Sequence, residues 1–156
     1  MQNPSENKGA YLGIDIPISS ANTDGTGFML CESVKFTAKN GIAIISTANS
    51  NLDGTGTVAD LISGSSSGTL IKRIIIKAQG NTTQGMVRIF FKASGSYWLL
   101  REVEIPAITQ SSQDQTLIEI SDEQFYLKPS YTLSVSTEKA ETFIVTAEGL
   151  DMSYPS

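Results

Sequence analysis

The residues whose spacing matches a known metal-binding loop lie between positions 49 and 60. Oxygen-bearing side chains occupy ligand positions of a calcium-loop pattern at Asn49, Asn51, Asp53 and Asp60. Gly54 stands at the sixth position, where such a loop bends sharply. However, the first position is neutral, the last is the shorter aspartate, and the flanking residues have the patterns of strands instead of helices. The segment therefore predicts a structural turn, with a weak calcium site as the alternative.

Side chains for acid–base or nucleophilic catalysis are scarce. The chain contains no histidine, which excludes Ser-His-Asp and Cys-His arrangements and zinc held by histidine. Glu102 and Glu104 share a strand face, but nothing nearby would raise the pKa of either carboxylate, and we expect solvated charges. No glycine-rich loop opens a helix to hold phosphate. The sequence predicts no catalytic residues, no enzymatic activity and no cofactor apart from the weak calcium alternative.

Two adjacent aromatic residues, Tyr97 and Trp98, follow the turn at residues 94–96. An exposed indole beside a phenol can stack on a sugar ring and donate hydrogen bonds, so this pair is the candidate glycan contact. A lone tryptophan at the start of a strand is more often part of a core or an interface. Both interpretations stay open from the sequence.

Charge is divided along the chain. Six basic residues and no carboxylate lie between residues 70 and 101, whereas residues 102–151 hold ten acidic residues and two lysines. Cross-strand neutralisation is one interpretation. The other is that patches of opposite sign meet between subunits, which fixes their register. The net charge of −5 and the few interleaved aromatic residues argue against nucleic-acid binding.

The elements that must position these residues are short extended runs separated by turn-forming clusters. Candidate strands occur at residues 11–18, 28–37, 42–47, 58–62, 70–78, 86–93, 97–105, 116–120, 131–137 and 142–148. The turn signals between them include Asn40-Gly41 and Asp53-Gly54. Most turns lie about ten residues apart, which is typical of an all-β sandwich or barrel. We expect an all-β, antiparallel β-sandwich of about eight to ten strands.

Periodicity within the runs indicates which residues face the core. Val87, Ile89 and Phe91 share one face, which is the pattern of a half-buried antiparallel strand. Ser134 and Ser136 alternate with apolar neighbours in the same way. The run at residues 74–76 is instead apolar on both faces, so we expect it to be covered on both sides, within the sandwich or by another subunit.

The chain of 156 residues fits a single domain. We expect a flexible N-terminal arm at residues 1–9, because this polar segment buries too little apolar surface, and a single β-sandwich domain at residues 10–156. The first residues lack the pattern of a secretion signal, and no apolar run approaches the length of a membrane span. These features predict a protein made in a cytoplasm that does not span a membrane.

Several segments of the sequence resemble segments of a known class of proteins. They lie at residues 53–58, 68–71, 74–78, 82–90, 99–106, 127–133 and 141–149. Together they resemble small β-sandwich virion proteins of tailed bacteriophages. The resemblance spans residues 53–149 and consists of turns and core positions, without an active-site motif.

The resemblance implies a jelly-roll-like domain that assembles on a symmetric particle, often as a trimer. It implies a structural protein of the virion, a capsid or tail accessory or decoration component, made in the host cytoplasm. Its partners would be other capsid or tail proteins and further copies of itself. The alternative function is a carbohydrate-binding β-sandwich module for receptor or glycan recognition, centred on Tyr97 and Trp98.

Overall fold

A computed structural model describes residues 34–122 and 124–154 of the chain. Within them the chain forms nine β-strands and no helix. In chain order these are β1 (Lys35–Ile45), β2 (Ala59–Ser63), β3 (Thr69–Ala78), β4 (Gly85–Ala93), β5 (Ser96–Ile105), β6 (Leu117–Ile120), β7 (Phe125–Leu127), β8 (Thr132–Thr137) and β9 (Phe143–Ser153). The all-β prediction is confirmed. The predicted arm at residues 1–9 and the predicted strand at 11–18 lie outside the described residues.

The strands pair in a nested order, and every pairing between them is antiparallel. β1 pairs with β9, β2 with β8, β3 with both β6 and β7, and β4 with β5. This nesting is that of one long antiparallel ribbon rolled up on itself. Two further pairings, β3 with β9 and β4 with β8, join the rolled ribbon into two sheets. The result is a jelly-roll sandwich: the antiparallel sandwich is the one that the strand and turn pattern predicts, and the jelly-roll order is the one that the resemblance implies.

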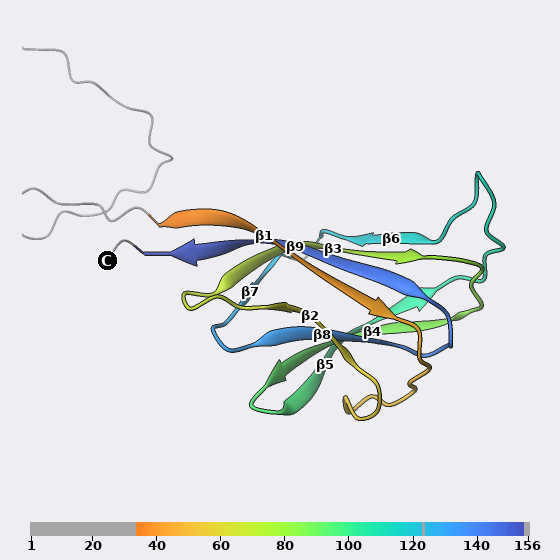
Figure 1. The fold of residues 1–156 in the computed structure, drawn as a ribbon, viewed down its shortest axis with the longest axis horizontal. Helices are drawn as coiled ribbons and strands as arrows, with labels where there is room; N and C mark the ends of the chain where they lie inside the picture. Colours follow the sequence, from red (N-terminus) through yellow and green to blue (C-terminus); the bar gives the residue numbers. More distant parts are fainter. Residues whose placement is uncertain (1–33, 123, 155–156) are drawn as a thin grey trace, which may run out of the picture. The chain divides into compact units, whose positions relative to one another are not determined.

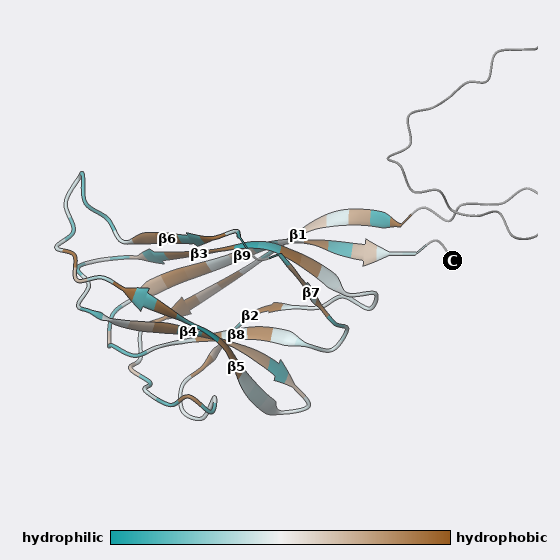
Figure 2. Cartoon of the chain, turned by 180° about the vertical axis from the view of Figure 1, so that it is seen from behind, coloured by the Kyte–Doolittle hydropathy of each residue, from teal (hydrophilic) through white to brown (hydrophobic). Residues whose placement is uncertain are grey.

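The two sheets form two layers, drawn one above the other in Figure 1. The five-stranded sheet has the order β1-β9-β3-β6, with β7 also on β3, and the four-stranded sheet has the order β2-β8-β4-β5. Apolar side chains from both sheets meet in one core, among them Ile76, Val87, Leu133 and Val145, each fully buried. Burying each such side chain stabilises the fold by about 1.5–3 kcal/mol. Figure 2 shows hydrophobic residues along strands of both sheets.

Gly41 marks the place where the edges of the two sheets meet. The sequence predicts a turn at Asn40-Gly41, and this prediction is wrong, because both residues lie inside β1 and pair with β9. A Cβ atom on Gly41 would lie 2.1 Å from the carbonyl oxygen of Leu61 in β2. Glycine is required here because the backbones of β1 and β2 approach so closely.

Residues 117–127 contribute two short strands to the edge of the five-stranded sheet. The predicted strand at residues 116–120 is confirmed as β6, whereas β7 is not predicted. Both strands pair with β3, with Ile118 opposite Ile76 and Phe125 opposite Ile71. Their half-buried side chains pack against the core and close part of the side of the sandwich opposite Gly41.

Candidate assembly surfaces

The loop between β1 and β2, residues 46–58, covers the outer face of the four-stranded sheet. The Asn49 amide N–H donates to the carbonyl oxygen of Thr137 at the end of β8, at 2.7 Å. The Asn49 side chain holds the loop closed by donating to the carbonyl oxygens of Thr55 and Thr57, each at 2.9 Å. The loop gives this face a covering layer, so side chains that point out of the sandwich are buried there.

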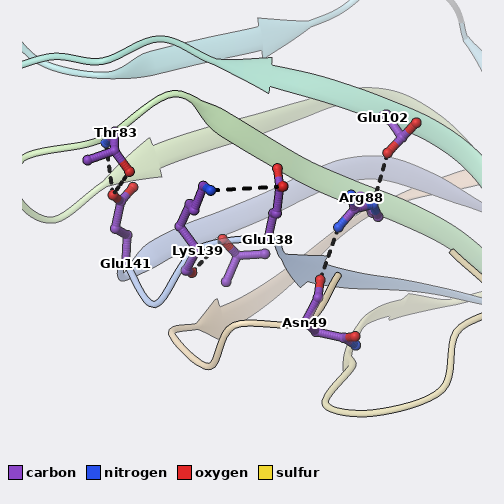
Figure 3. Close-up of polar contacts among 8 residues, drawn as sticks. Asn49, Thr83, Arg88, Glu102, Glu138, Lys139 and Glu141 are labelled. Carbon is purple, nitrogen blue, oxygen red and sulfur yellow. Dashed lines mark hydrogen bonds and ion pairs between the residues drawn. The ribbon is translucent and has the colours of Figure 1, made fainter. Parts of the chain in front are cut away.

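Arg88 is the charged side chain buried under this loop. It lies on β4 and is only 5% exposed. Its Nε donates to Glu102 Oε1 on β5 at 2.9 Å, and its Nη1 donates to the carbonyl oxygen of Asn49 at 3.0 Å (Figure 3). A buried charge is tolerated only with such partners. The guanidinium therefore links β4, β5 and the covering loop.

The second glutamate of the predicted pair, Glu104, has a different partner. Its Oε1 accepts a hydrogen bond from Gln84 Nε2 at 3.0 Å. Glu102 and Glu104 lie on the same face of β5, as the sequence predicts, opposite Arg88 and Met86 of β4. Each of the two carboxylates thus accepts a hydrogen bond from a different side chain.

The predicted calcium residues fall into two groups. Three gather on Thr55: Asn49 donates to its carbonyl oxygen, Asn51 Nδ2 donates to its Oγ1 at 2.8 Å, and Asp53 accepts from its N–H and hydroxyl. These hydrogen bonds from Thr55 hold the pKa of Asp53 below its ordinary value. Asp60 has other partners on β4 and β8. Within residues 34–122 and 124–154 no cluster of three or more Asp, Glu, Cys or His side chains is placed to hold a metal. Calcium binding by the loop stays a prediction.

Asp60 belongs to an ion pair on the outer face of the four-stranded sheet. Its carboxylate accepts from Lys92 Nζ at 2.8 and 3.0 Å and from Ser134 Oγ at 2.8 Å. Burial alone raises the pKa of Asp60, but the hydrogen bonds from Lys92 and Ser134 outweigh it and lower that pKa. The carboxylate therefore stays charged and joins β2 to β4 and β8.

The two candidate glycan residues lie on opposite faces of β5. Tyr97 is half-buried, with its ring edge-on to Phe90 at 6.2 Å and close against Gly54 of the covering loop. The indole of Trp98 is 52% exposed. Successive strand residues point to opposite sides, so these two rings do not form one stacking platform.

Ion pairs connect the basic and acidic halves of the chain across strands. Arg73 on β3 binds Glu148 on β9 through Nε and Nη2, at 2.6 and 2.9 Å. This hydrogen bonding lowers the pKa of Glu148. Arg101 lies 3.9 Å from Asp122, and Arg88 pairs with Glu102 as described above. The interpretation as cross-strand neutralisation is confirmed for Arg73 and Arg88, whereas the partner of Arg101 lies in the loop between β6 and β7.

The outer face of β1 is an exposed apolar surface. Its outward-pointing residues carry no charge, and three of them are large: Phe36 is 53% exposed, Ile42 66% and Ile44 62%. Ile75 of β3 is half-buried on the same face, two strands away across β9. The sequence predicts that both faces of residues 74–76 are covered. This holds for the core side, where Ile74 and Ile76 are buried, but Ile75 on the outer side is only half-buried.

A second exposed apolar surface lies along β5. Trp98, Leu99 and Leu100 are consecutive and all exposed. The register shifts between Ile89 and Phe90 of β4 leave Leu100 as an extra residue, a β-bulge. A groove of about 320 Å³ runs between this strand and β6. Neither surface was predicted from the sequence, although the apolar run at residues 42–45 has the same doubly apolar pattern as residues 74–76.

No helix that could cross a membrane is present in the part of the chain that the structure describes.

Comparisons with known proteins give distant structural likenesses. No family model and no curated protein sequence matches this chain. A chain in the acidic stable capsid structure of Helicobacter pylori bacteriophage KHP30 is similar at a TM-score of 0.45 and 8% identity, over 80% of this chain and 99% of that chain. A chain in the cryo-EM structure of the virus-like particle of giant freshwater prawn Macrobrachium rosenbergii extra small virus is similar at a TM-score of 0.40 and 13% identity, over 94% of this chain and 95% of that one.

Proposed function

We propose that this chain is a structural protein of a tailed-bacteriophage virion, a capsid or tail accessory or decoration component. The observation that carries the proposal is the pair of long apolar edge strands, β1 and β5, that the jelly-roll sandwich leaves exposed. Monomeric proteins rarely expose such edges, since they invite pairing with another chain. The resemblance of residues 53–149 to small phage virion proteins supports the bacteriophage part of the proposal.

The proposed role is passive. The core and the backbone ladders supply rigidity, the covering loop at residues 46–58 stiffens one face, and the exposed strands make contacts with other virion proteins or further copies. The protein acts in the virion after synthesis in the host cytoplasm, as a trimer, without catalytic activity. Jelly rolls serve this purpose in many shells, but also occur in lectins, so the fold by itself does not decide the role.

Purified particles test the proposal. Phage grown in cells that express the chain with a C-terminal tag would be banded in a density gradient, treated with high salt and examined by mass spectrometry. We expect the tagged chain at a fixed copy number per major capsid protein. A chain that stays in the soluble fraction while complete, infectious particles band without it would contradict the proposal.

A carbohydrate-binding module is the second candidate, and the exposed indole of Trp98 favours it. Its test is a titration with mono- and oligosaccharides while the fluorescence of Trp98, the only tryptophan, is followed. A saturable shift that Trp98→Leu abolishes would support glycan binding. Unchanged fluorescence across a broad glycan panel would reject it.

A further inference from the structure

The two exposed apolar edges lie on opposite sides of the sandwich. β1 is the first strand of the five-stranded sheet, and β5 is the last strand of the four-stranded sheet. The first strands of both sheets, β1 and β2, are on the same side, because Gly41 lies directly against Leu61. β5 must therefore lie on the other side, next to β6. A contact that uses both edges joins two different surfaces.

Both edges offer unpaired backbone groups. Within the described residues β1 pairs with β9 alone, and β5 pairs with β4 alone. Each strand therefore has one row of N–H and C=O groups that no described strand satisfies. The strands are 11 and 10 residues long, so both span about 35 Å. Their matched length allows one to pair with the other along its whole course.

The side chains at the two edges favour burial. Phe36, Ile42 and Ile44 of β1 and Trp98 and Leu100 of β5 are large, apolar and exposed. Leu100, the extra residue of the bulge, lies beside Ile120 and Phe125 at the opening between the two sheets and adds exposed apolar surface next to this edge. Aromatic residues of this kind often carry most of the binding energy of an interface.

Charge decides which edges meet. β1 contains Lys35 and Lys39 and no carboxylate, whereas the second half of β5 contains Glu102 and Glu104 beside a single Arg101 and is net negative. Two β1 edges placed together would bring no opposite charges to each other, because β1 has lysines and no carboxylate. An antiparallel contact that sets Trp98 near Ile44 instead brings the glutamate half of β5 beside the lysine half of β1. Opposite charges fix the register of such a contact, and like charges oppose the alternative.

We propose that the edge of β1 on one copy pairs with the edge of β5 on a second copy, so that the chain assembles head to tail. A contact between two different surfaces closes into a ring when the rotation allows it, and the trimer proposed above is such a ring. This inference rests on the proposed function, because it names the partner and the surfaces of the assembly.

Two full-length variants test the proposal, one for each edge. Ile44→Lys places a charge on the contact surface of β1, and Trp98→Lys places one on that of β5. Both side chains are exposed, so the monomer should still fold. The matched control is Leu52→Lys, which changes a similarly exposed apolar residue in the covering loop, outside both strands. Circular dichroism and thermal unfolding would confirm that each variant is folded.

Size-exclusion chromatography with light scattering gives the first readout. We expect the wild type and Leu52→Lys to form the same closed oligomer. Each edge variant should be monomeric at that concentration, with its dissociation constant raised at least about 30-fold.

Mixing the two edge variants gives the decisive readout. Ile44→Lys keeps a working β5 edge and Trp98→Lys keeps a working β1 edge, so an equimolar mixture should form a 1:1 heterodimer and nothing larger. A mixture that stays monomeric, or an edge variant that assembles like the wild type, would overturn the proposal.

A wild type that remains monomeric at the highest soluble concentration would also overturn it. In that monomer, protection from hydrogen exchange of the β1 amides that do not bond to β9 would show that another segment of the same chain covers this edge. None of these failures would refute the virion role, because incorporation into banded particles is measured separately.

Discussion

Replacing Gly41 with alanine tests the closure of the sandwich between β1 and β2. The new Cβ atom would lie 2.1 Å from the Leu61 carbonyl oxygen and 2.7 Å from the Cβ of Ile62. Both are fixed atoms of the neighbouring strand, so relief requires movement of β1 or β2. The substitution cannot be absorbed by a side-chain rotation.

The expected magnitude follows from two opposing effects. Alanine in place of glycine inside a strand ordinarily stabilises a protein by roughly 0.5–1 kcal/mol, because glycine loses more backbone entropy on folding. Overpacking typically costs about 1–3 kcal/mol, and a clash with backbone lies at the upper end or beyond. We expect a net loss of about 1–3 kcal/mol in the free energy of unfolding, and a melting temperature lower by roughly 3–10 °C.

Urea and thermal unfolding of Gly41→Ala would measure this loss, with Gly80→Ala as the matched control. A Cβ atom on Gly80 has no heavy atom within 4 Å. The control should be neutral or stabilised by about 0.4–1 kcal/mol. If Gly41→Ala is as stable as the wild type, or changes in the same way as Gly80→Ala, the close approach of β1 and β2 is refuted.

Three further measurements test the covering loop and the ion pairs. In urea unfolding, Glu102→Ala should cost about 2–3 kcal/mol, because it leaves the buried guanidinium of Arg88 without a carboxylate partner. Arg88→Met should cost less, because the Glu102 carboxylate that it leaves behind can reach water, and the reverse order would contradict this explanation. The pKa of Glu148 is lowered by its hydrogen bonds from Arg73, so its stabilisation is present above its ordinary pKa of about 4.3 and is lost as the pH falls through the lower native value. Glu148→Gln should accordingly be less stable than the wild type at pH 7 and nearly equal to it in strong acid, and a difference that does not change with pH would refute the pairing. The structural-turn interpretation predicts that calcium leaves the melting temperature unchanged, and a rise that Asp53→Asn abolishes would instead show a calcium site.

Much of the fold could be predicted from residue types and their spacing. The alternation of Val87, Ile89 and Phe91 places these residues on the core side of β4, as the structure confirms. Asp53-Gly54 is a turn, with a positive φ of 78° at Gly54. Both features depend on the local backbone: side chains alternate across a strand, and glycine tolerates the left-handed conformation. They can be predicted without knowledge of distant contacts.

The candidate sites could be predicted only in part. The sequence shows that Tyr97 and Trp98 are adjacent. It does not show that Gly54 of the covering loop packs against Tyr97, while Trp98 on the other face of the strand stays exposed. Likewise, the spacing of Asn49, Asn51 and Asp53 brings them to one turn, whereas the partner of Asp60 lies 32 residues away at Lys92. Contacts between distant segments determined which of these side chains remain available.

The sequence by itself determined the strand character, most of the turns and the residues that share a face. Tertiary structure decided what covers each face. Ser134 and Ser136 alternate like surface residues, yet both are buried under the loop at residues 46–58. Ile42 and Ile44 belong to an apolar run, yet both are exposed on an edge. The physical reason is that alternation distinguishes the two sides of a strand, whereas burial depends on whether a distant segment of chain packs against that side.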